Sequence, residues 1–381
     1  MFVCAIICEY NPFHRGHEIQ IERLRDMFPD ACILSLQSGS FVQRGECAII
    51  SKYKRAEAAV TCGADLVLEL PFPWCAQGAH YFARAGVDIL NSVGADVLCF
   101  GSETGDLQSL SLAAQRLASP EFIAECKKNE AESMESSTSH IASLRATYKS
   151  LYGSDLPLGS NDILGIEYLK SIAATESKMK PICIRREGGY TATLAREYYK
   201  SSEFELLCGA VPECLCDLYR DTPPVMTSEL GMTMLNFFRT HTPDELAKYA
   251  DLGGGLAGRL CRAANSAADY ESFIAAAATK KYTNARIRRA ILSAMLRVSE
   301  DELKRKPRFT ALLAANKNGT AFLRSVKKSA EIEIITRPAA GKALEGEAAE
   351  QFAFSYSADT LWALAAGIPP SELANERPYI K

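Results

Sequence analysis

Two histidines near the start of the chain, His14 and His17, have the type and spacing expected of groups that act on phosphate. They lie in the segment Glu9-Tyr10-Asn11-Pro12-Phe13-His14-Arg15-Gly16-His17. Imidazole N–H groups donate hydrogen bonds to phosphate oxygens and stabilise the charge that develops when a phosphorus atom is attacked. The chain has 5 histidines, so a pair at this spacing is an informative signal. A chance match and half of a metal site are the alternatives.

The elements around the two histidines are those of a ligand-binding sheet edge. The apolar run from Val3 to Ile7 predicts a buried strand, and the amphipathic run from about Gly16 to Met27 predicts a helix. The histidines then lie at the carboxyl end of a first strand, where open α/β sheets bind ligands. The helix start offers free N–H groups to phosphate, and Gly16 allows close approach of a nucleotide. His-x-Gly-His in this position is the ATP-handling signature of the nucleotidyltransferase superfamily.

Composition limits the class of protein. A chain of 381 residues predicts about two domains, and 48% hydrophobic with 23% charged residues indicates a globular protein. No apolar run reaches the roughly eighteen residues of a membrane span, and we expect no signal peptide and no membrane partner. The net charge of −3 means that a nucleic acid would have to bind to a local basic patch.

The 13 cysteines predict neither disulfides nor a metal site. Their number is odd, and Cys4, Cys32 and Cys99 lie inside apolar runs, where cysteine behaves as a small hydrophobic residue. Cys214 and Cys216 are too close together for a zinc knuckle and have no partner pair. We therefore expect a protein of the reducing cytoplasm.

The first half of the chain predicts an α/β fold. Further strands are expected at 31–38, 64–71, 95–100 and 180–186, and helices at 52–62 and 76–93. This alternation implies right-handed crossovers and a Rossmann-like, nucleotidyltransferase-type parallel sheet in a domain of residues 1–200. Alanine-rich periodicity between about 228 and 299 predicts a mostly α-helical second domain, residues 201–381, with a strand at 331–336.

A basic segment in the second half could bind nucleic acid. Lys281 and Tyr282 precede a predicted helix on which Arg286 and Arg289, three residues apart, share a face. Such a cluster, with a tyrosine able to stack on a base, suits a phosphate backbone. A solvated helix face is the alternative reading.

Several ordered motifs together resemble those of the bacterial tRNA(Met) cytidine acetate ligases, whose signature includes the His-x-Gly-His pair. The matching segments are Cys8 to His17, Ser38 to Glu46, Gly63 to Pro71, Phe100 to Glu103, Tyr282 to Arg289, and Asn318-Gly319. The resemblance therefore extends over nearly the whole chain.

The resemblance implies a reaction in two steps. ATP, with Mg²⁺, and acetate give acetyl-adenylate, and the wobble cytidine of elongator tRNA(Met) then takes the acetyl group at N4. It implies His14 and His17 as catalytic residues, and Lys281, Arg286 and Arg289 as contacts to tRNA. The implied ATP-binding residues are Ile7, Cys8, Glu9, Tyr10, Asn11, Pro12, Phe13, His14, Arg15, Gly16, His17, Glu18, Ile19, Gln20, Gly101, Asn161 and Arg185.

Some assignments stay open on the residues alone. Either Arg185 or Arg186 would pair with phosphate, and Asn161 could instead cap the helix that follows it. Gln43 and Arg44 lie on a loop that could reach substrate or could be a structural turn. The sequence after Tyr190 is shorter than is usual in the family. Another adenylyltransferase or cytidylyltransferase, or an inactive RNA-binding scaffold, would share part of this pattern.

Overall fold

The computed structural model describes residues 1–381 apart from 133–139, 158, 187–188, 190 and 328. The segment that we expect to be shorter than is usual in the family begins at Tyr190, and Tyr190 lies outside the described residues. The described residues form one sheet of 8 strands in the order β5-β4-β1-β2-β3-β6-β7, with β8 beside β6. The strands are β1 (Val3–Cys8), β2 (Cys32–Ser38), β3 (Leu66–Leu70), β4 (Val97–Ser102), β5 (Lys180–Arg185), β6 (Phe309–Ala315), β7 (Glu333–Ile335) and β8 (Tyr379–Ile380).

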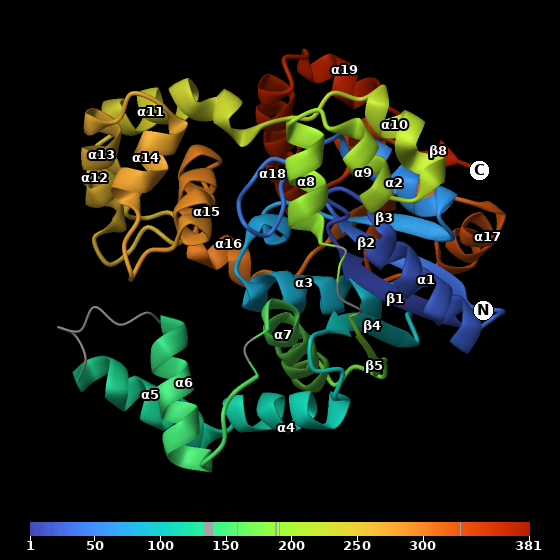
Figure 1. Cartoon of the computed structure of the whole chain (residues 1–381), viewed down its shortest axis with the longest axis horizontal. Coiled ribbons are helices and arrows are strands. Elements are labelled where there is room, and N and C mark those ends of the chain that lie inside the picture. The colour runs from blue at the N-terminus through green and yellow to red at the C-terminus, as the bar shows by residue number, and fades with distance from the viewer. Residues whose placement is uncertain (133–139, 158, 187–188, 190, 328) are drawn as a thin grey trace.

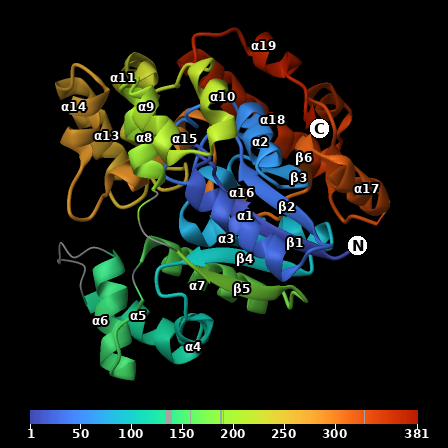
Figure 2. The ribbon, with the colours of Figure 1, turned by 45° about the vertical axis from the view of Figure 1, so that its right-hand side comes forward.

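The helices alternate with strands as far as β4, and beyond it they mostly follow one another. They are α1 (Arg15–Met27), α2 (Lys52–Thr61), α3 (Ala79–Ser92), α4 (Leu107–Leu117), α5 (Pro120–Glu132), α6 (His140–Tyr152), α7 (Ser160–Ala174), α8 (Ala192–Lys200), α9 (Phe204–Ala210), α10 (Cys216–Arg220), α11 (Gly231–Thr240), α12 (Pro243–Leu246), α13 (Leu256–Ser266), α14 (Tyr270–Ala277), α15 (Asn284–Met295), α16 (Glu300–Lys304), α17 (Lys317–Val326), α18 (Gly346–Ala365) and α19 (Pro370–Asn375). Figures 1 and 2 show α11 to α15 gathered to one side of the sheet, with α5 and α6 projecting separately.

The first five strands confirm the predicted parallel sheet. β1 pairs in parallel with both β2 and β4, and β4 pairs in parallel with β5. The strand order runs outward from β1 through β2 and β3 on one side, and from β4 to β5 on the other. The chain therefore changes direction across the sheet between β1 and β4, and open α/β sheets bind ligands outside the carboxyl ends of two such strands.

Strand β1 separates two hydrophobic layers because its side chains alternate between the two faces of the sheet. Val3, Ala5 and Ile7 belong to the core that includes residues of α3 and α7. Cys4, Ile6 and Cys8 belong to the core on the other face, with residues of α1 and α2. Burial on both faces explains why β1 reads as a continuous apolar run and not as an alternating one.

The second half of the chain contributes strands to the same sheet. β6 pairs antiparallel with β3, and the hydroxyl of Thr310 donates to the carbonyl oxygen of Glu69 at 2.7 Å. β7 and β8 both pair with β6, which places the strand expected at 331–336 in this sheet. Segments on both sides of residue 200 thus share one sheet, and the division of the chain into domains at that point stays a prediction.

The cysteines and helices agree with the expectations from composition. All 13 cysteines are free thiols. No helix in the described part of the chain combines the length and apolar character that a membrane span requires.

Candidate active site

The histidine pair forms the N-terminus of helix α1. His14 is the N-cap, and its Nδ1 accepts a hydrogen bond from the backbone N–H of Gly16 at 3.0 Å. Nδ1 of His17 accepts one from the backbone N–H of His14 at 3.2 Å. The two ring centroids are 3.8 Å apart. The histidines thus take the two reciprocal positions of a capping box, which orients both rings.

Both imidazoles are neutral at physiological pH. Burial, together with the charges of Arg186 and Arg196, lowers the pKa of His14 from 6.5 to about 3. Burial also lowers the pKa of His17 well below its usual value, with His14 and Arg186 adding to the shift. Because each Nδ1 accepts a backbone N–H, the ring proton of each lies on Nε2. The pair therefore offers two neutral N–H donors at a helix N-terminus, where anions bind.

Aromatic packing holds the histidine motif in place. The rings of Tyr10 and Phe13 lie edge to face, with centroids 4.8 Å apart, and both lie against the ring of His17. The hydroxyls of Tyr10 and Ser35 are hydrogen bonded at 2.9 Å, which ties the motif to β2. The conformation of the motif is thus fixed by the hydrophobic core below it.

Two arginines add positive charge beside the neutral histidines. Arg196, on α8, donates from Nη1 to the carbonyl oxygen of Asn11 at 2.7 Å, and its charge acts on both Glu9 and His14. Arg186 follows β5, and its charge acts on both histidines. Sequence reasoning missed Arg196. Arg196 could have been found from its position on the helix that follows the fifth strand, because that strand ends at the same edge of the sheet as the strand before the histidine motif.

The structure distinguishes the two consecutive arginines. Arg185 pairs in register with Ser102, and a Cβ at Gly105 would lie 2.6 Å from Cβ of Arg185. The next residue, Arg186, lies just beyond the end of β5. A Cβ built on Gly101 would lie 3.3 Å from Cγ of Arg186. Gly101 and Arg186 therefore come together near the histidine pair, while Arg185 stays a prediction without that geometry.

Asn161 lies in the first turn of α7 and does not cap it. The N-cap is Gly159, so the alternative in which Asn161 caps this helix is wrong. The Glu103 carboxylate takes that role, accepting from the backbone N–H of Asn161 at 3.2 Å and of Asp162 at 2.9 Å. The Asn161 amide also donates to Glu103, at 2.6 Å. This contact holds Asn161 beside the end of β4, and its role toward a nucleotide stays a prediction.

The loop that contains Gln43 and Arg44 is a fixed turn that touches the histidine motif. The backbone N–H of Gln43 donates to Oε1 of Glu9 at 2.8 Å, and the backbone N–H of Gly45 donates to the carbonyl oxygen of Val42 at 2.8 Å. Burial raises the pKa of Glu9, although the Gln43 bond and nearby arginines oppose that shift. The side chain of Arg44 is exposed. Both earlier readings of this loop are therefore compatible: it is a structural turn, and it lies beside the site.

The basic segment forms the start of α15. Arg286 and Arg289 lie on one face, as predicted, and each has its Nε 3.6 Å from a carboxylate oxygen of Asp251. Lys281 is exposed. Tyr282, in contrast, is buried and donates from its hydroxyl to the carbonyl oxygen of Gly254. The expectation that this tyrosine is free to stack on a base is therefore wrong.

The fold and the histidine site together define a nucleotidyltransferase. The family model described as HIGH Nucleotidyl Transferase matches residues 1–376, and the chain belongs to that family. It is 30% identical over 369 residues to the tRNA(Met) cytidine acetate ligase of Acetivibrio thermocellus, with 88% of each chain covered. It is 32% identical over 372 residues to the enzyme of the same name from Alkaliphilus metalliredigens, again with 88% of each chain covered. Within the nucleotidyltransferases, the chain is therefore a member of the tRNA(Met) cytidine acetate ligase family.

A solved structure agrees over the whole length. The crystal structure of Thermotoga maritima TmcAL bound with alpha-thio ATP superposes with a TM-score of 0.91 at 27% sequence identity. The match covers 100% of this chain and 99% of that chain. The expected fold class and the expected family are both confirmed.

Proposed function

We propose that this chain is an ATP-dependent ligase that forms acetyl-adenylate and transfers its acetyl group to N4 of the wobble cytidine of elongator tRNA(Met). The observation that carries the proposal is the pair of neutral histidines at the start of α1, which follows β1 at the position where the strand order reverses between β1 and β4. The relatives named as tRNA(Met) cytidine acetate ligases support the choice of reaction, and the TmcAL structure with an ATP analogue supports the nucleotide. We propose that the reaction takes place in the cytoplasm, the compartment that a tRNA substrate favours.

In the first step, a carboxylate oxygen of acetate attacks the α-phosphorus of ATP. The bond from that phosphorus to the bridging oxygen breaks, and pyrophosphate leaves with the electron pair. Nε2–H of His14 and of His17 would donate to triphosphate oxygens, while Arg186 and Arg196 offset the charge that develops. Mg²⁺ would enter with ATP as part of the nucleotide substrate. No proton has to leave the protein in this step, which suits histidines that are already neutral.

In the second step, the N4 amine of cytidine attacks the acetyl carbonyl carbon. The bond from that carbon to the adenylate oxygen breaks, AMP leaves as the phosphate anion, and one N4 proton passes to solvent. The amine reacts with an activated ester, so the protein has mainly to hold the two groups together. The proposed ATP-binding residues are the segment Ile7 to Gln20, Gly101 and Asn161, with Arg185 retained as predicted and Arg186 added by its geometry.

The proposed contact with tRNA is the N-terminal part of α15. Lys281, Arg286 and Arg289 would neutralise phosphates of the RNA backbone. Arg44 is a further exposed cation on the turn beside Glu9, and the carbonyl oxygen of Arg44 accepts from Nε of Arg288 at 3.1 Å. A path of basic residues thus connects α15 to the neighbourhood of the histidines.

The test is transfer of labelled acetate to unmodified elongator tRNA(Met) with ATP and Mg²⁺, alongside pyrophosphate release without tRNA. We expect label in the tRNA, and its loss when the wobble cytidine is replaced. Pyrophosphate release without transfer would instead indicate another nucleotidyltransferase with a different acceptor. ATP-dependent RNA binding with neither activity would indicate a scaffold.

A further inference from the structure

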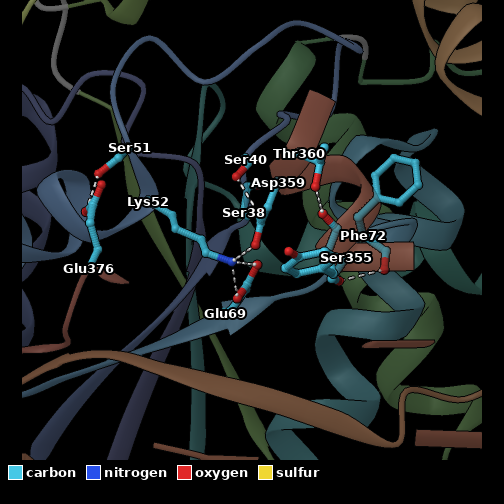
Figure 3. Close-up of polar contacts among 12 residues, drawn as sticks. Ser38, Ser40, Ser51, Lys52, Glu69, Phe72, Ser355, Asp359, Thr360 and Glu376 are labelled. Carbon is cyan, nitrogen blue, oxygen red and sulfur yellow. Dashed lines mark hydrogen bonds and ion pairs between the residues drawn. The ribbon is translucent and has the colours of Figure 1, made fainter. Parts of the chain in front are cut away.

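A buried ion cluster joins the C-terminal part of the chain to the carboxyl edge of the sheet. Nζ of Lys52, at the start of α2, lies 2.9 Å from Oε1 of Glu69 on β3 and 2.8 Å from Oδ2 of Asp359 on α18. Figure 3 shows the ammonium group between the two carboxylates. The Lys52 and Glu69 side chains are only 6% and 3% exposed, so solvent screens this cluster little.

The ion cluster fixes the positions of α2, β3 and α18 relative to one another. Burial alone would lower the pKa of Lys52, but the charges of Asp359 and Glu69 outweigh it and raise that pKa well above its usual value. Lys52 therefore stays protonated. A buried ion pair contributes little net stability compared with an apolar contact, because desolvation offsets the attraction. The consequence of the cluster is geometric. Asp359 can contact Lys52 only when α18 packs in its observed position.

Asp359 also holds one loop, residues 39–48, which we call the bridging loop. Oδ1 of Asp359 accepts from the hydroxyl of Ser40 at 2.6 Å (Figure 3). One turn along α18, Nε1 of Trp362 donates to the carbonyl oxygen of Ala48 at 2.7 Å. Ser40 and Ala48 are near the two ends of the bridging loop, where the Ala48 N–H donates to the Ser40 carbonyl oxygen at 2.9 Å. Helix α18 therefore fixes the base of the loop from both ends.

The tip of the bridging loop lies between the histidine motif and α15. On one side the backbone of Gln43 donates to Glu9. On the other side Arg288 donates to the carbonyl oxygen of Arg44 and forms an ion pair with Glu46 at 3.1 Å. The contact with α15 is so close that a Cβ at Gly45 would lie 2.7 Å from the backbone nitrogen of Arg289. A shift at the base of the bridging loop would therefore move the loop tip, which lies between the histidine motif and α15.

We propose that Asp359 is a positioning residue for acetyl transfer, which is itself held by Lys52 and acts through Ser40 to hold the bridging loop between the histidine motif and α15. The inference rests on the proposed function and concerns its second step. Formation of acetyl-adenylate depends less on the loop, because His14 and His17 are held by hydrogen bonds within their own helix start. Transfer depends on it more, because the acceptor cytidine has to reach the adenylate past the loop tip.

The test compares Asp359→Ala with Thr360→Ala. Thr360 is the adjacent residue on α18, and its hydroxyl donates to the Tyr356 carbonyl oxygen within the same helix at 2.9 Å. In Asp359→Ala we expect kcat for transfer to tRNA to fall about tenfold, the size of one charge-assisted hydrogen bond. Pyrophosphate release without tRNA and KM for tRNA should change less than about twofold, and Thr360→Ala should behave as wild type. Equal losses of both half-reactions in Asp359→Ala would overturn the proposal.

A coupling measurement tests whether Asp359 acts through the loop. Ser40→Ala removes a single hydrogen bond and should reduce transfer in the same direction, with little risk to folding. The double variant Ser40→Ala, Asp359→Ala should be no slower than Asp359→Ala alone, because both changes release the same contact. Additive losses would show that Asp359 acts by another route and would overturn the proposal.

Limited proteolysis supplies a readout that does not require activity. The exposed Arg44 is a trypsin site at the loop tip, and cleavage there requires local release of the loop. We expect faster cleavage after Arg44 in Asp359→Ala and in Ser40→Ala than in wild type or Thr360→Ala. Unchanged cleavage would overturn the positioning role, even if wild-type protein failed to acetylate tRNA. Absence of transfer by wild-type protein would overturn the proposed function, and with it the role in transfer, while faster cleavage in the variants would still show that Asp359 holds the bridging loop.

Discussion

His17 accepts a hydrogen bond from the backbone N–H of His14, and His14 in turn caps the helix that carries His17. Nδ1 of His17 accepts from His14 and Nδ1 of His14 accepts from Gly16, which leaves Nε2–H of both rings for a ligand. The arrangement links two roles: the same side chains build the helix start and, in the proposed function, donate to the phosphate. Replacement of either histidine therefore removes a donor and also loosens its neighbour.

The first prediction concerns His17→Ala. We expect adenylate formation to fall about 10²–10³-fold, the range found when one preorganised donor to a developing charge is removed. Affinity for tRNA should be unchanged, because α15 carries the proposed RNA contacts. Pyrophosphate release and filter binding measure the two properties. His241→Ala, at an exposed histidine after α11, is the control. Parallel loss of both properties would argue against a role at the phosphate.

The second prediction concerns stability at low pH. The folded-state pKa of His14 is about 3, against 6.5 for the free side chain, so between these values the unfolded chain binds more protons. This difference makes the free energy of unfolding decrease as the pH falls from 6.5 toward 3. Asparagine caps helices well, so His14→Asn should be nearly as stable as wild type at pH 7. Urea unfolding at pH 7 and pH 5 should show a smaller decrease in the variant. Identical decreases would contradict the assignment.

The parallel part of the sheet could be predicted because short, local sequence patterns specify its strands. Each of the first five strands precedes a helix and is a short apolar run that ends near a glycine, a proline or a charged residue. Each observed strand therefore lies within about two residues of the predicted one. The histidine motif was predictable for the same reason, since it directly follows β1. Its neutral protonation state was not, because that depends on burial and on Arg186 and Arg196.

The features that sequence reasoning missed depend on contacts between distant residues. β6 lies beside β3, yet Leu66 and its partner Ala315 are far apart in the chain, and no local pattern specifies their pairing. The cap of α7 comes from Glu103, so a search for a capping residue next to the helix found the wrong one. The Lys52–Asp359 ion pair was invisible for the same reason.

The third prediction separates the two consecutive arginines after β5. Arg186→Ala should raise KM for ATP about tenfold or more, because a charged donor beside the histidines is lost. Arg185→Ala should change KM for ATP little, since Arg185 lies in register with Ser102 and against Gly105. The two variants remove the same charge one residue apart, so each controls for the other. A larger effect of Arg185→Ala would restore the original assignment.

The fourth prediction concerns the basic face of α15. Changing Arg286 and Arg289 together to alanine should weaken tRNA binding and reduce the slope of log affinity against log salt by about one to two. Lys281→Ala should reduce that slope by up to about one without affecting stability, because its side chain is exposed. Binding measured at several salt concentrations tests both. Unchanged affinity and slope in the double variant would make α15 a purely structural helix.

The double variant Arg286→Ala, Arg289→Ala should also be less stable than wild type, whereas Lys281→Ala should not. Asp251 is only 25% exposed, and burial raises the pKa of its carboxyl while Arg289 and Arg286 lower it. Loss of Arg289 leaves this half-buried carboxylate with one partner fewer, which lowers the melting temperature. Adding Asp251→Asn to Arg289→Ala removes the uncompensated charge and should restore part of the loss. If the second change lowers the melting temperature further, Asp251 has a structural role that does not depend on these arginines, and the ion-pair explanation fails.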